Sequence, residues 1–563
     1  MYMRQIRLEG FRGLDTSVTL DAPLGLIVGE NNVGKSAVID AIRVLFQPQA
    51  GRRFNRWLTP ADFSHDGHGD NRVNRLRLSA ELFDIAESQR GRMISALAPS
   101  LGAGAGRLTM IAQLDEHDRV STRWEGGDLG HTDVETMARE AIRYVYLPPL
   151  RDAASDLQPG STNRLAGLLT AFAPPGHPDR SELETIMSDA NTALESVDAV
   201  VKAATAIGQR LKGLTGTGVY AHQAAMTFSR PKYDRIISTL QALAGRNTPL
   251  GLDENGLGYN NLLYMSVLLG ALENDSDTPL NLLLVEEPEA HLHPQLQDLL
   301  MRYLEAESSS DTTQVVMTTH SPQLASSAHV ERITILARDG VSNASATALG
   351  QLRLTSKDAA FLRRFLDVTK SALLFSQGVL LVEGIAEQLV VPQFAARMGV
   401  PLSEHGITVV NVGGLAFQPF LTLFQDNGLP YRCAVLSDSD PATNEDGTEE
   451  AMSPTARGLF EIESDKIHVG LATKTFEWDV AHANAGEPEL LLTALASVRP
   501  IVGARLRTEQ PQGPSGFADA YLEAARNHKG RVAQELAVAL ESSSEVEFEI
   551  PAYIADAISW LTQ

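Results

Sequence analysis

The order GENNVGKS, residues 29 to 36, constrains this chain more than any other stretch, because it has the spacing of a phosphate-binding loop. The run LGLIVG before it is apolar and β-branched, as in a buried strand, and apolar residues after it recur at helical spacing. In that context the loop's backbone N–H groups can surround phosphate oxygens at a helix N-terminus. We therefore expect Lys35 to meet the β and γ phosphates of a nucleotide and Ser36 to hold Mg²⁺. The alternative is a glycine turn with an unrelated lysine. The other loop residues expected at the nucleotide are Gly29, Asn31, Asn32 and Gly34.

Composition is that of an ordinary globular protein. Its 563 residues, 43% hydrophobic and 21% charged, predict roughly two to four domains with ample core. No apolar run reaches the ~18 residues of a membrane span, and the start MYMRQIRLEG lacks the apolar segment of a secretory signal. The single cysteine, Cys433, cannot form an internal disulfide, which agrees with a reducing compartment. We therefore expect a cytoplasmic protein with no membrane partner.

The net charge of −23 argues against a surface coated with nucleic acid, so any contact with DNA must be local. One stretch offers such a contact: residues 201–246 contain seven basic residues and a single acid, Asp234. A solvated helical face or a contact between subunits would explain the same pattern equally well. The basic residues are Lys202, Arg210, Lys212, Arg230, Lys232, Arg235 and Arg246.

The pattern along the first half predicts a mixed α/β fold with an inserted helical segment. MRQIRLEGFRGL and VTLDAPLGLIV are each expected to form one strand before the loop, and RLRLSAELF, RLTMIAQLD and YVYLPPL further strands. From 154 to 235 the chain is instead rich in Ala, Leu and polar residues, with breaks at PPGHP and GLTGTG. This segment is too short and too weak in heptads to be a long coiled-coil arm.

Three later motifs complete the expected nucleotide site. The run LNLLLVEEPEAHLHP predicts a buried strand that ends in Glu286 and Glu287, and QVVMTTH predicts a strand that ends in His320. Glu286 would hold Mg²⁺ through water, Glu287 would orient or polarise the attacking water, and His320 would sense the γ-phosphate. Residues 256–261, including Gly258, would present backbone donors to a nucleotide bound by a second copy, the arrangement of ABC-type ATPases. That resemblance implies a homodimer.

Acidic residues follow two apolar strands in the second half. Glu383 ends the strand GVLLVEG, and Glu387 falls in the first turn of the next helix. The strand RCAVLSDSD ends in Asp438 and Asp440, whose period-two spacing would put both side chains on one face. Four such acids form an oxygen-rich cage suited to two Mg²⁺ or Mn²⁺ ions, which can activate water against a phosphodiester. The alternative is structural: helix capping by Glu387 and an Asx-turn at Asp438.

The four acids, with the intervening strand ITVVNVGG, look like a Toprim domain. Together with the ATPase motifs they resemble the OLD (overcoming lysogeny defect) family of ATP-dependent nucleases. The resemblance covers both ends of the chain: GENNVGKS, VEEPEAHLHP, TTHSPQL, LLVEG and LSDSD occur in the family's order. It implies an α/β fold with an ABC-type P-loop ATPase head, a helical insertion that dimerises, and a C-terminal, Rossmann-like Toprim nuclease domain. The expected boundaries are 1–153 and 236–365 for the two ATPase parts, 154–235 for the insertion and 366–563 for the Toprim domain.

The same resemblance assigns residues further along. Glu383, Glu387, Asp438 and Asp440 match the family's metal ligands. KTFEWDV resembles the stretch with a further acid, here Glu477, with Asp479 as the second choice, and HKGRVAQELA resembles the segment with a catalytic lysine, here Lys529. A lysine near the scissile phosphate could offset developing negative charge.

These motifs favour a homodimeric, ATP-hydrolysing and Mg²⁺- or Mn²⁺-dependent DNA endonuclease. Family relatives act in defence against phage, some beside a helicase partner. A competing hypothesis is an ATP-switched DNA clamp or repair scaffold whose Toprim domain does not cut. A topoisomerase or primase is the third possibility, but Tyr264 and Tyr303 lie within ATPase motifs and no second cleavage domain is recognisable.

Overall fold

The computed structural model describes the chain except for residues 21–22, 47–56, 66–71, 129–133, 150–155, 161–162, 246, 274–277, 309–311, 340–342, 415–416, 426, 441–451, 510, 512 and 544. The chain divides into two compact units. One comprises Met1–Tyr146, Leu282–Glu289 and Pro294–Gln563, and the other comprises Leu147–Asn281 and Ala290–His293. Of the basic stretch expected at 201–246, Arg246 lies outside the described residues.

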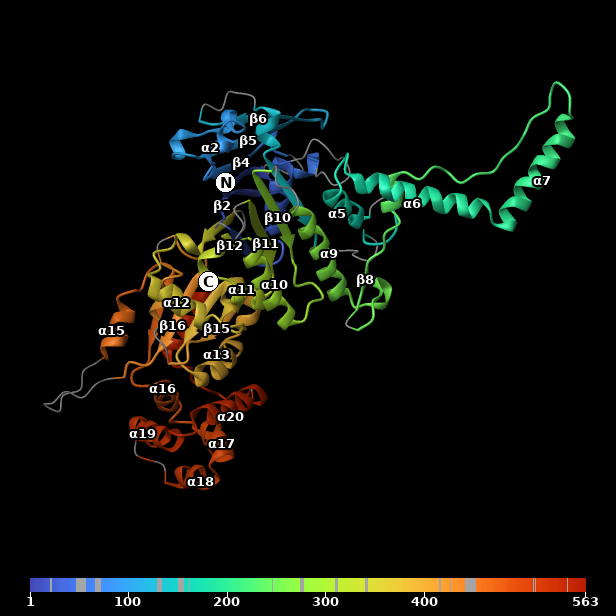
Figure 1. The fold of residues 1–563 in the computed structure, drawn as a ribbon. Coiled ribbons are helices and arrows are strands. Elements are labelled where there is room, and N and C mark those ends of the chain that lie inside the picture. The colour runs from blue at the N-terminus through green and yellow to red at the C-terminus, as the bar shows by residue number, and fades with distance from the viewer. Residues whose placement is uncertain are drawn as a thin grey trace. The chain divides into compact units, whose positions relative to one another are not determined.

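The N-terminal strands form an antiparallel sheet in the order β2-β1-β4-β5-β6 (Figure 1). Alternation of buried and exposed residues along β1 buries one face of this sheet, as expected where the other face meets solvent. The strands are β1 Tyr2–Phe11, β2 Leu14–Thr19, β4 Arg75–Phe83, β5 Gly106–Leu114 and β6 Val120–Gly126.

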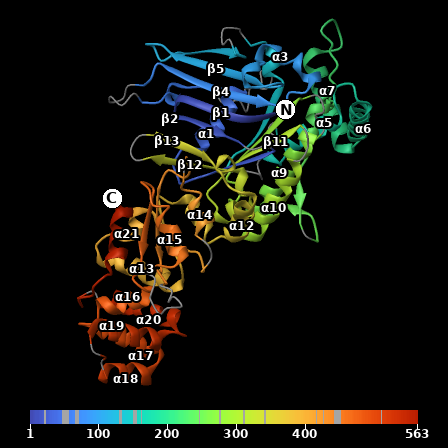
Figure 2. The same cartoon turned by 90° about the vertical axis from the view of Figure 1, so that its left-hand side faces the viewer.

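A second sheet, in the order β13-β12-β3-β11-β10-β7, positions the nucleotide-binding motifs. Its inner strands are almost wholly buried, and β11 and β12 pair in parallel with β3. Helix α1, Lys35–Leu45, lies between the two sheets and contacts β1 and β4 on one side and β11 on the other (Figure 2). The strands are β3 Leu24–Val28, β7 Ile142–Leu147, β10 Leu280–Glu286, β11 Thr313–Thr319, β12 Ile333–Asp339 and β13 Asn343–Ala348.

One strand prediction was wrong. The run VTLDAPLGLIV was expected to be a single strand, but it forms the end of β2 and then β3, which belong to different sheets. Pro23 stands directly before β3, and proline cannot donate a ladder hydrogen bond. The chain therefore leaves the first sheet before it enters the second.

The third sheet, β15-β14-β16-β17, is parallel throughout. In its register Val382 of β14 lies opposite Leu436 of β16. The next residues along the chain, Glu383 and Ser437, therefore lie at the same carboxyl edge of the sheet. Helices α13 (Ile385–Arg397), α16 (Phe476–Ala483), α17 (Glu489–Val498), α18 (Pro500–Thr508), α19 (Gly513–Ala525), α20 (Lys529–Ser542) and α21 (Ala552–Thr562) contribute to one apolar core with it. The strands are β14 Gly378–Val382, β15 Ile407–Asn411, β16 Arg432–Ser437 and β17 Ile467–Leu471.

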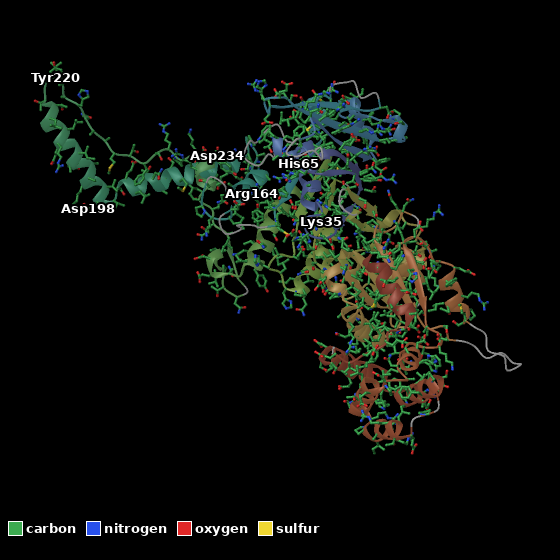
Figure 3. All side chains as sticks on the ribbon, turned by 180° about the vertical axis from the view of Figure 1, so that it is seen from behind. Lys35, His65, Arg164, Asp198, Tyr220 and Asp234 are labelled. Atoms are coloured by element: carbon green, nitrogen blue, oxygen red, sulfur yellow. The ribbon has the colours of Figure 1, made fainter. Side chains whose placement is uncertain are left out.

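The smaller unit contains the helices expected between 154 and 235. They are α5 Arg164–Phe172, α6 Pro178–Glu195, α7 Asp198–Thr215 and α8 Tyr233–Ile237. None of the residues of α6 or α7 is buried, and Figure 3 shows Arg164, Asp198 and Tyr220 in that order along this helical segment. The same unit contains α9, Leu257–Glu273, close to the start expected near Gly256. Among the described residues, no helix is both long and apolar enough to cross a membrane.

Candidate functional sites

The phosphate-binding loop joins β3 to α1 in a conformation that only glycine allows at two places. Gly29 has φ 152°, and a Cβ there would lie 2.1 Å from the carbonyl oxygen of Leu336. Gly34 has φ 112°, and its Cβ would lie 2.8 Å from a methyl group of Leu14. Backbone in this region favours glycine strongly. The loop is therefore shaped by close approach of neighbouring chain, while Asn31 and Asn32 remain exposed on it.

Lys35 closes the loop on itself. Its Nζ donates to the carbonyl oxygens of Gly29, at 2.7 Å, and Glu30, at 2.6 Å, and lies 3.1 Å from Nδ1 of His320. Burial lowers the pKa of Lys35 to about 8, although the charges of Glu287 and two other glutamates oppose this effect. In this structure the partners of the buried ammonium group include two uncharged carbonyl oxygens. The phosphate oxygens of a nucleotide would give it negatively charged partners instead.

The Glu286 carboxylate is hydrogen-bonded to the hydroxyl of Ser36. Burial raises the pKa of Glu286, while hydrogen bonds from the hydroxyls of Ser36 and Tyr146 oppose that rise. The Tyr146 hydroxyl donates to Oε1 of Glu286 at 2.8 Å, and the guanidinium of Arg43 lies 3.7 Å from the centre of the Tyr146 ring. The structure thus brings the two residues expected to share a magnesium ion into contact.

Glu287 and His320 also meet. Nε2 of His320 lies 3.0 Å from Oε1 of Glu287. Glu289, which the sequence analysis did not select, accepts hydrogen bonds from the His320 N–H at 2.8 Å and from the Thr319 hydroxyl at 2.7 Å. The three residues therefore form one polar cluster around Lys35, and Glu289 fixes the end of the strand that delivers His320.

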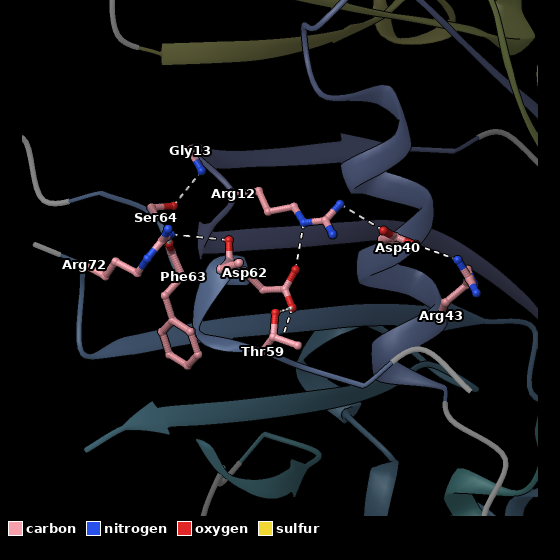
Figure 4. Close-up of polar contacts among 10 residues, drawn as sticks. Arg12, Gly13, Asp40, Arg43, Thr59, Asp62, Phe63, Ser64 and Arg72 are labelled. Carbon is pink, nitrogen blue, oxygen red and sulfur yellow. Dashed lines mark hydrogen bonds and ion pairs between the residues drawn. The ribbon is translucent and has the colours of Figure 1, made fainter. Parts of the chain in front are cut away.

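A largely buried polar network supports α1 from the other side (Figure 4). Arg12 bridges Asp62, at 2.8 Å, and Asp40, at 2.9 Å, and Asp40 in turn contacts Arg43 at 2.7 Å. Because Arg43 lies over the Tyr146 ring, this network reaches the partner of Glu286. Its members come from three separate segments, since Asp40 and Arg43 share α1, so local sequence patterns do not indicate the whole network.

In the smaller unit, Gly258 lies in the first turn of α9 against residues 290–293. A Cβ at Gly258 would lie 2.5 Å from the carbonyl oxygen of His291, and the Asn261 amide donates to the carbonyl of Ala290 at 3.4 Å. A side chain at 258 would therefore push the start of the helix away from that segment. Tyr259 is 63% exposed, so this end of the helix is open to a partner.

The expected acids of the third sheet gather at its carboxyl edge. Oε2 of Glu383 accepts hydrogen bonds from the Ser437 hydroxyl at 3.1 Å and the Asp438 N–H at 3.2 Å. Burial raises the pKa of Glu387 to about 7, with further contributions from Glu477 and Glu383. Burial also raises the pKa of Asp438 to about 8, and Glu383 and Glu387 add to the rise. The carboxylates are therefore close enough to repel one another.

Glu477 and Lys529 join this acidic cluster, which we define as Glu383, Glu387, Asp438 and Glu477. Nζ of Lys529 donates to Oε2 of Glu477 at 2.7 Å. Burial alone would lower the pKa of Lys529, but Glu477, Asp438 and Glu387 raise it on balance. Lys529 is the first residue of α20 and Glu477 lies in the first turn of α16, so two helix N-termini deliver them.

Asp440 is not brought into the cluster in the same way. Strand β16 ends at Ser437, so the strand alternation expected to align Asp438 with Asp440 does not continue to them. Asp440 is exposed, has φ 41°, and its N–H donates to the carbonyl of Lys474 at 3.4 Å. The backbone of the loop after β16 turns at Asp440, where its N–H bonds to Lys474 in the segment after β17.

The donor set of the acidic cluster fits hard divalent cations. All its side-chain donors are carboxylate oxygens, and burial, with repulsion between the acids as a smaller contribution, raises the pKa of Glu387 and Asp438, so a cation bound here would stabilise their ionised forms. Within the described ranges, however, no three Asp, Glu, His or Cys residues converge to the spacing that holds a metal ion. Side-chain rotation would be needed to bring the oxygens around an ion.

Sequence reasoning did not select Glu289 or Tyr146, and it gave Asp479 second place. Glu289 stands two residues after Glu287 in the EEPEAH motif, so the motif contained the signal. Tyr146 reaches its site from β7, a strand distant in sequence, and no periodicity marks it.

Comparison with known proteins identifies both halves. A model described as "AAA ATPase domain" matches residues 1–93 and 154–325. A model described as "Overcoming lysogenization defect protein-like, TOPRIM domain" matches residues 374–440, which include Glu383, Glu387 and both aspartates.

Similar proteins include "Uncharacterized protein YbjD" of Escherichia coli, 22% identical over 87% of this chain and 90% of the relative. "OLD nuclease" of Thermus scotoductus is 24% identical over 74% of this chain and 78% of its own length. "Endonuclease GajA" of Bacillus cereus is 23% identical over 36% and 33%. A solved structure of the C-terminal region of the Burkholderia pseudomallei OLD protein is 25% identical, covering 33% of this chain and 97% of that one, with a TM-score of 0.27. The chain therefore combines an AAA ATPase domain with a Toprim domain that resembles those of OLD proteins.

Proposed function

We propose that this protein is an ATP-binding and ATP-hydrolysing, divalent-metal-dependent DNA endonuclease that acts in defence against phage in the cytoplasm. The observation that carries the proposal is the acidic cluster with Lys529, because side chains from four separate segments meet at one edge of a parallel sheet. Burying like charges together is costly, and such clusters of perturbed acids are typical of functional sites. The relatives named nucleases and endonucleases support the same chemistry.

In the ATPase head, Lys35 would release its two carbonyl partners and bind the β and γ phosphates. Ser36 and Glu286 would hold the Mg²⁺ that accompanies ATP, Glu287 would orient the attacking water, and His320 would contact the γ-phosphate. Residues 256–261, with Gly258, would contact ATP on a second copy. A homodimer through the head and the helical insertion would follow.

In the Toprim domain, Glu383, Glu387, Asp438, Asp440 and Glu477 would hold up to two Mg²⁺ or Mn²⁺ ions. When bound, these ions would supply an activated water and stabilise the leaving oxygen of a phosphodiester. Glu383 is already oriented by Ser437 and the Asp438 backbone, and Lys529 stays charged beside the site. Its ammonium group would offset negative charge on the scissile phosphate.

A DNA clamp or repair scaffold is the second candidate, and one observation favours it. Among the described residues the acids do not reach metal-binding spacing, and Lys529 is paired with Glu477. In that case the nucleotide would switch the grip of the protein on DNA and the Toprim domain would not cut. A helicase or another defence protein would be its partner under either hypothesis.

Cleavage of supercoiled plasmid by the purified protein, with Mn²⁺ or after chelation, separates the two candidates. We expect cutting only with the metal, and we expect Asp438→Ala to abolish it while ATP binding is retained. Asp465→Ala, which removes an exposed acid outside the cluster, is the matched control and should cut normally. Lys35→Ala should lose ATP binding. Full cutting by Asp438→Ala would overturn the assignment of the nuclease site.

A further inference from the structure

Asp479 is an unusual acid in the Toprim domain because its carboxylate is buried behind the acidic cluster. The residue is 8% exposed and lies in the first turn of α16. Its Oδ2 accepts the Thr473 N–H at 2.6 Å, whereas its Oδ1 is buried and has no hydrogen-bond partner among the described residues. A buried carboxylate oxygen without a partner is costly, so an acid at this position needs a compensating use.

Its partner Thr473 belongs to the turn between β17 and α16, residues 472–475, and this turn bonds to the loop that bears Asp438. The Ser439 hydroxyl donates to the Thr473 carbonyl at 2.7 Å. The Ala472 N–H donates to the Ser437 carbonyl at 3.0 Å, and the Asp440 N–H donates to that of Lys474. Successive residues of the loop are thus held by successive residues of the turn.

The turn also leads directly to the Asp438 carboxylate. The Phe476 N–H, at the start of α16, donates to Oδ1 of Asp438 at 2.8 Å. This bond occupies one carboxylate oxygen and leaves Oδ2 for other partners. The same turn also starts α16, because the Asp479 N–H donates to the carbonyl of Thr475 at 3.0 Å.

Tyr553 reaches the same region from α21, which packs on β16 and β17. Burial raises its pKa well above the usual value, and of the surrounding charges that of Asp479 contributes most, followed by Asp438 and Glu387. The phenol therefore remains protonated and is a potential donor next to these carboxylates. No side chain in this set supplies a positive charge to Asp479.

We propose that Asp479 is a positioning residue of the nuclease site, which acts through the Thr473 turn to hold the Asp438 carboxylate in place and is not itself a metal ligand. The inference rests on the proposed function, because it assumes that Asp438 binds the ion. It assigns the ligand role in the FEWD segment to Glu477 alone. Residues that orient a ligand from behind characteristically tune metal affinity more than they determine the chemistry.

The test compares Asp479→Asn and Asp479→Ala in the full-length protein. Asparagine keeps an oxygen for the Thr473 N–H at nearly the same size, whereas alanine removes it. Mn²⁺ binding is measured without DNA, by loss of the free-ion electron paramagnetic resonance signal, and plasmid cutting is measured across a Mn²⁺ titration. Asp556→Asn, an exposed acid on α21, is the matched control, and Glu477→Gln represents a lost ligand.

We expect Asp479→Asn to bind Mn²⁺ nearly as wild type does and Asp479→Ala to bind ~10- to 100-fold more weakly, with cutting recovered at high Mn²⁺. Binding by Asp479→Asn as poor as that of Glu477→Gln would overturn the proposal, because the charge itself would then be needed. Wild-type binding by Asp479→Ala would overturn it too. If Asp479→Ala does not fold, as judged by thermal melting, Asp479→Asn alone decides. Wild-type protein that binds Mn²⁺ but cuts no DNA would refute the proposed function and leave this test intact.

Discussion

Single residues around the phosphate-binding loop are held by partners from outside the loop, and Glu289 is the clearest case. Its Oε1 accepts from the backbone of His320 and from the Thr319 hydroxyl. We expect Glu289→Ala to lower the rate of ATP hydrolysis by ~10- to 100-fold, because misplacing a catalytic group by about 1 Å is that costly. Glu289→Gln keeps the acceptor oxygen and should lose much less. Steady-state phosphate release measures both, and equal rates for the wild type and the alanine variant would contradict this role.

Glu387 shows the cost of gathering like charges. Burial and the neighbouring glutamates raise its pKa to about 7, so its ionised form destabilises the metal-free fold. The penalty is absent below the unfolded-state pKa, grows as the pH rises toward 7, and is complete above it. We therefore expect Glu387→Gln to raise the unfolding temperature of metal-free protein at pH 8 and to change it little at pH 5, while cutting is lost. A lower unfolding temperature at pH 8, measured by calorimetry after chelation, would count against burial and repulsion as the causes of the raised pKa.

At the scale of elements, one strand links the phosphate-binding loop to the acidic cluster. Gln377 immediately precedes β14, whose other end is followed by Glu383, and its side-chain amide donates to the Glu30 carboxylate. The Glu30 carbonyl in turn accepts from Lys35, so a nucleotide that draws Lys35 away would alter the position of Glu30 and its bond to Gln377. We expect Gln377→Ala to reduce the effect of ATP on DNA cutting, whichever its direction, while cutting without ATP stays unchanged. Gln351→Ala, which loses a surface bond to Thr19, is the control. An unaltered ratio of rates with and without ATP would exclude this route.

The elements that sequence predicted well are those with a local signal. β3, β10 and β14 are short, wholly buried strands and β16 is buried apart from Arg432; as the sequence pattern predicts, Glu286 ends β10, Glu383 follows β14 and Asp438 follows β16. Local patterns could not show where a strand stops: β2 and β3 were merged, and β16 was extended to Asp440. Nor could they show Tyr146 or Tyr553, because these side chains reach their sites through tertiary packing between segments far apart in sequence.

For the molecule as a whole, the net charge of −23 predicts that salt has opposite effects on its two expected interactions, with a second copy of the chain and with DNA. Two copies of an acidic chain repel each other, so salt should weaken that repulsion and favour a homodimer. DNA binding instead depends on lysines and arginines that displace counterions, and salt should weaken it steeply. Arg210 and Lys212 on the exposed helix α7 are candidates for that contact. Raising NaCl should therefore preserve self-association while it releases DNA.

Sedimentation velocity of Glu287→Gln, which should bind ATP without hydrolysing it, tests the homodimer directly. We expect a dimer with ATP and Mg²⁺ that survives added salt, because ATP held by Lys35 would be contacted by residues 256–261 of the second copy. Lys35→Ala is the control. If it is monomeric, the contact lies in the nucleotide-bound heads. If it is still a dimer, the exposed faces of α6 and α7 hold the copies together, since neither helix buries a residue within one chain. A monomer under every condition at micromolar concentration would contradict the homodimer and, with it, the completion of each ATP site by a second chain.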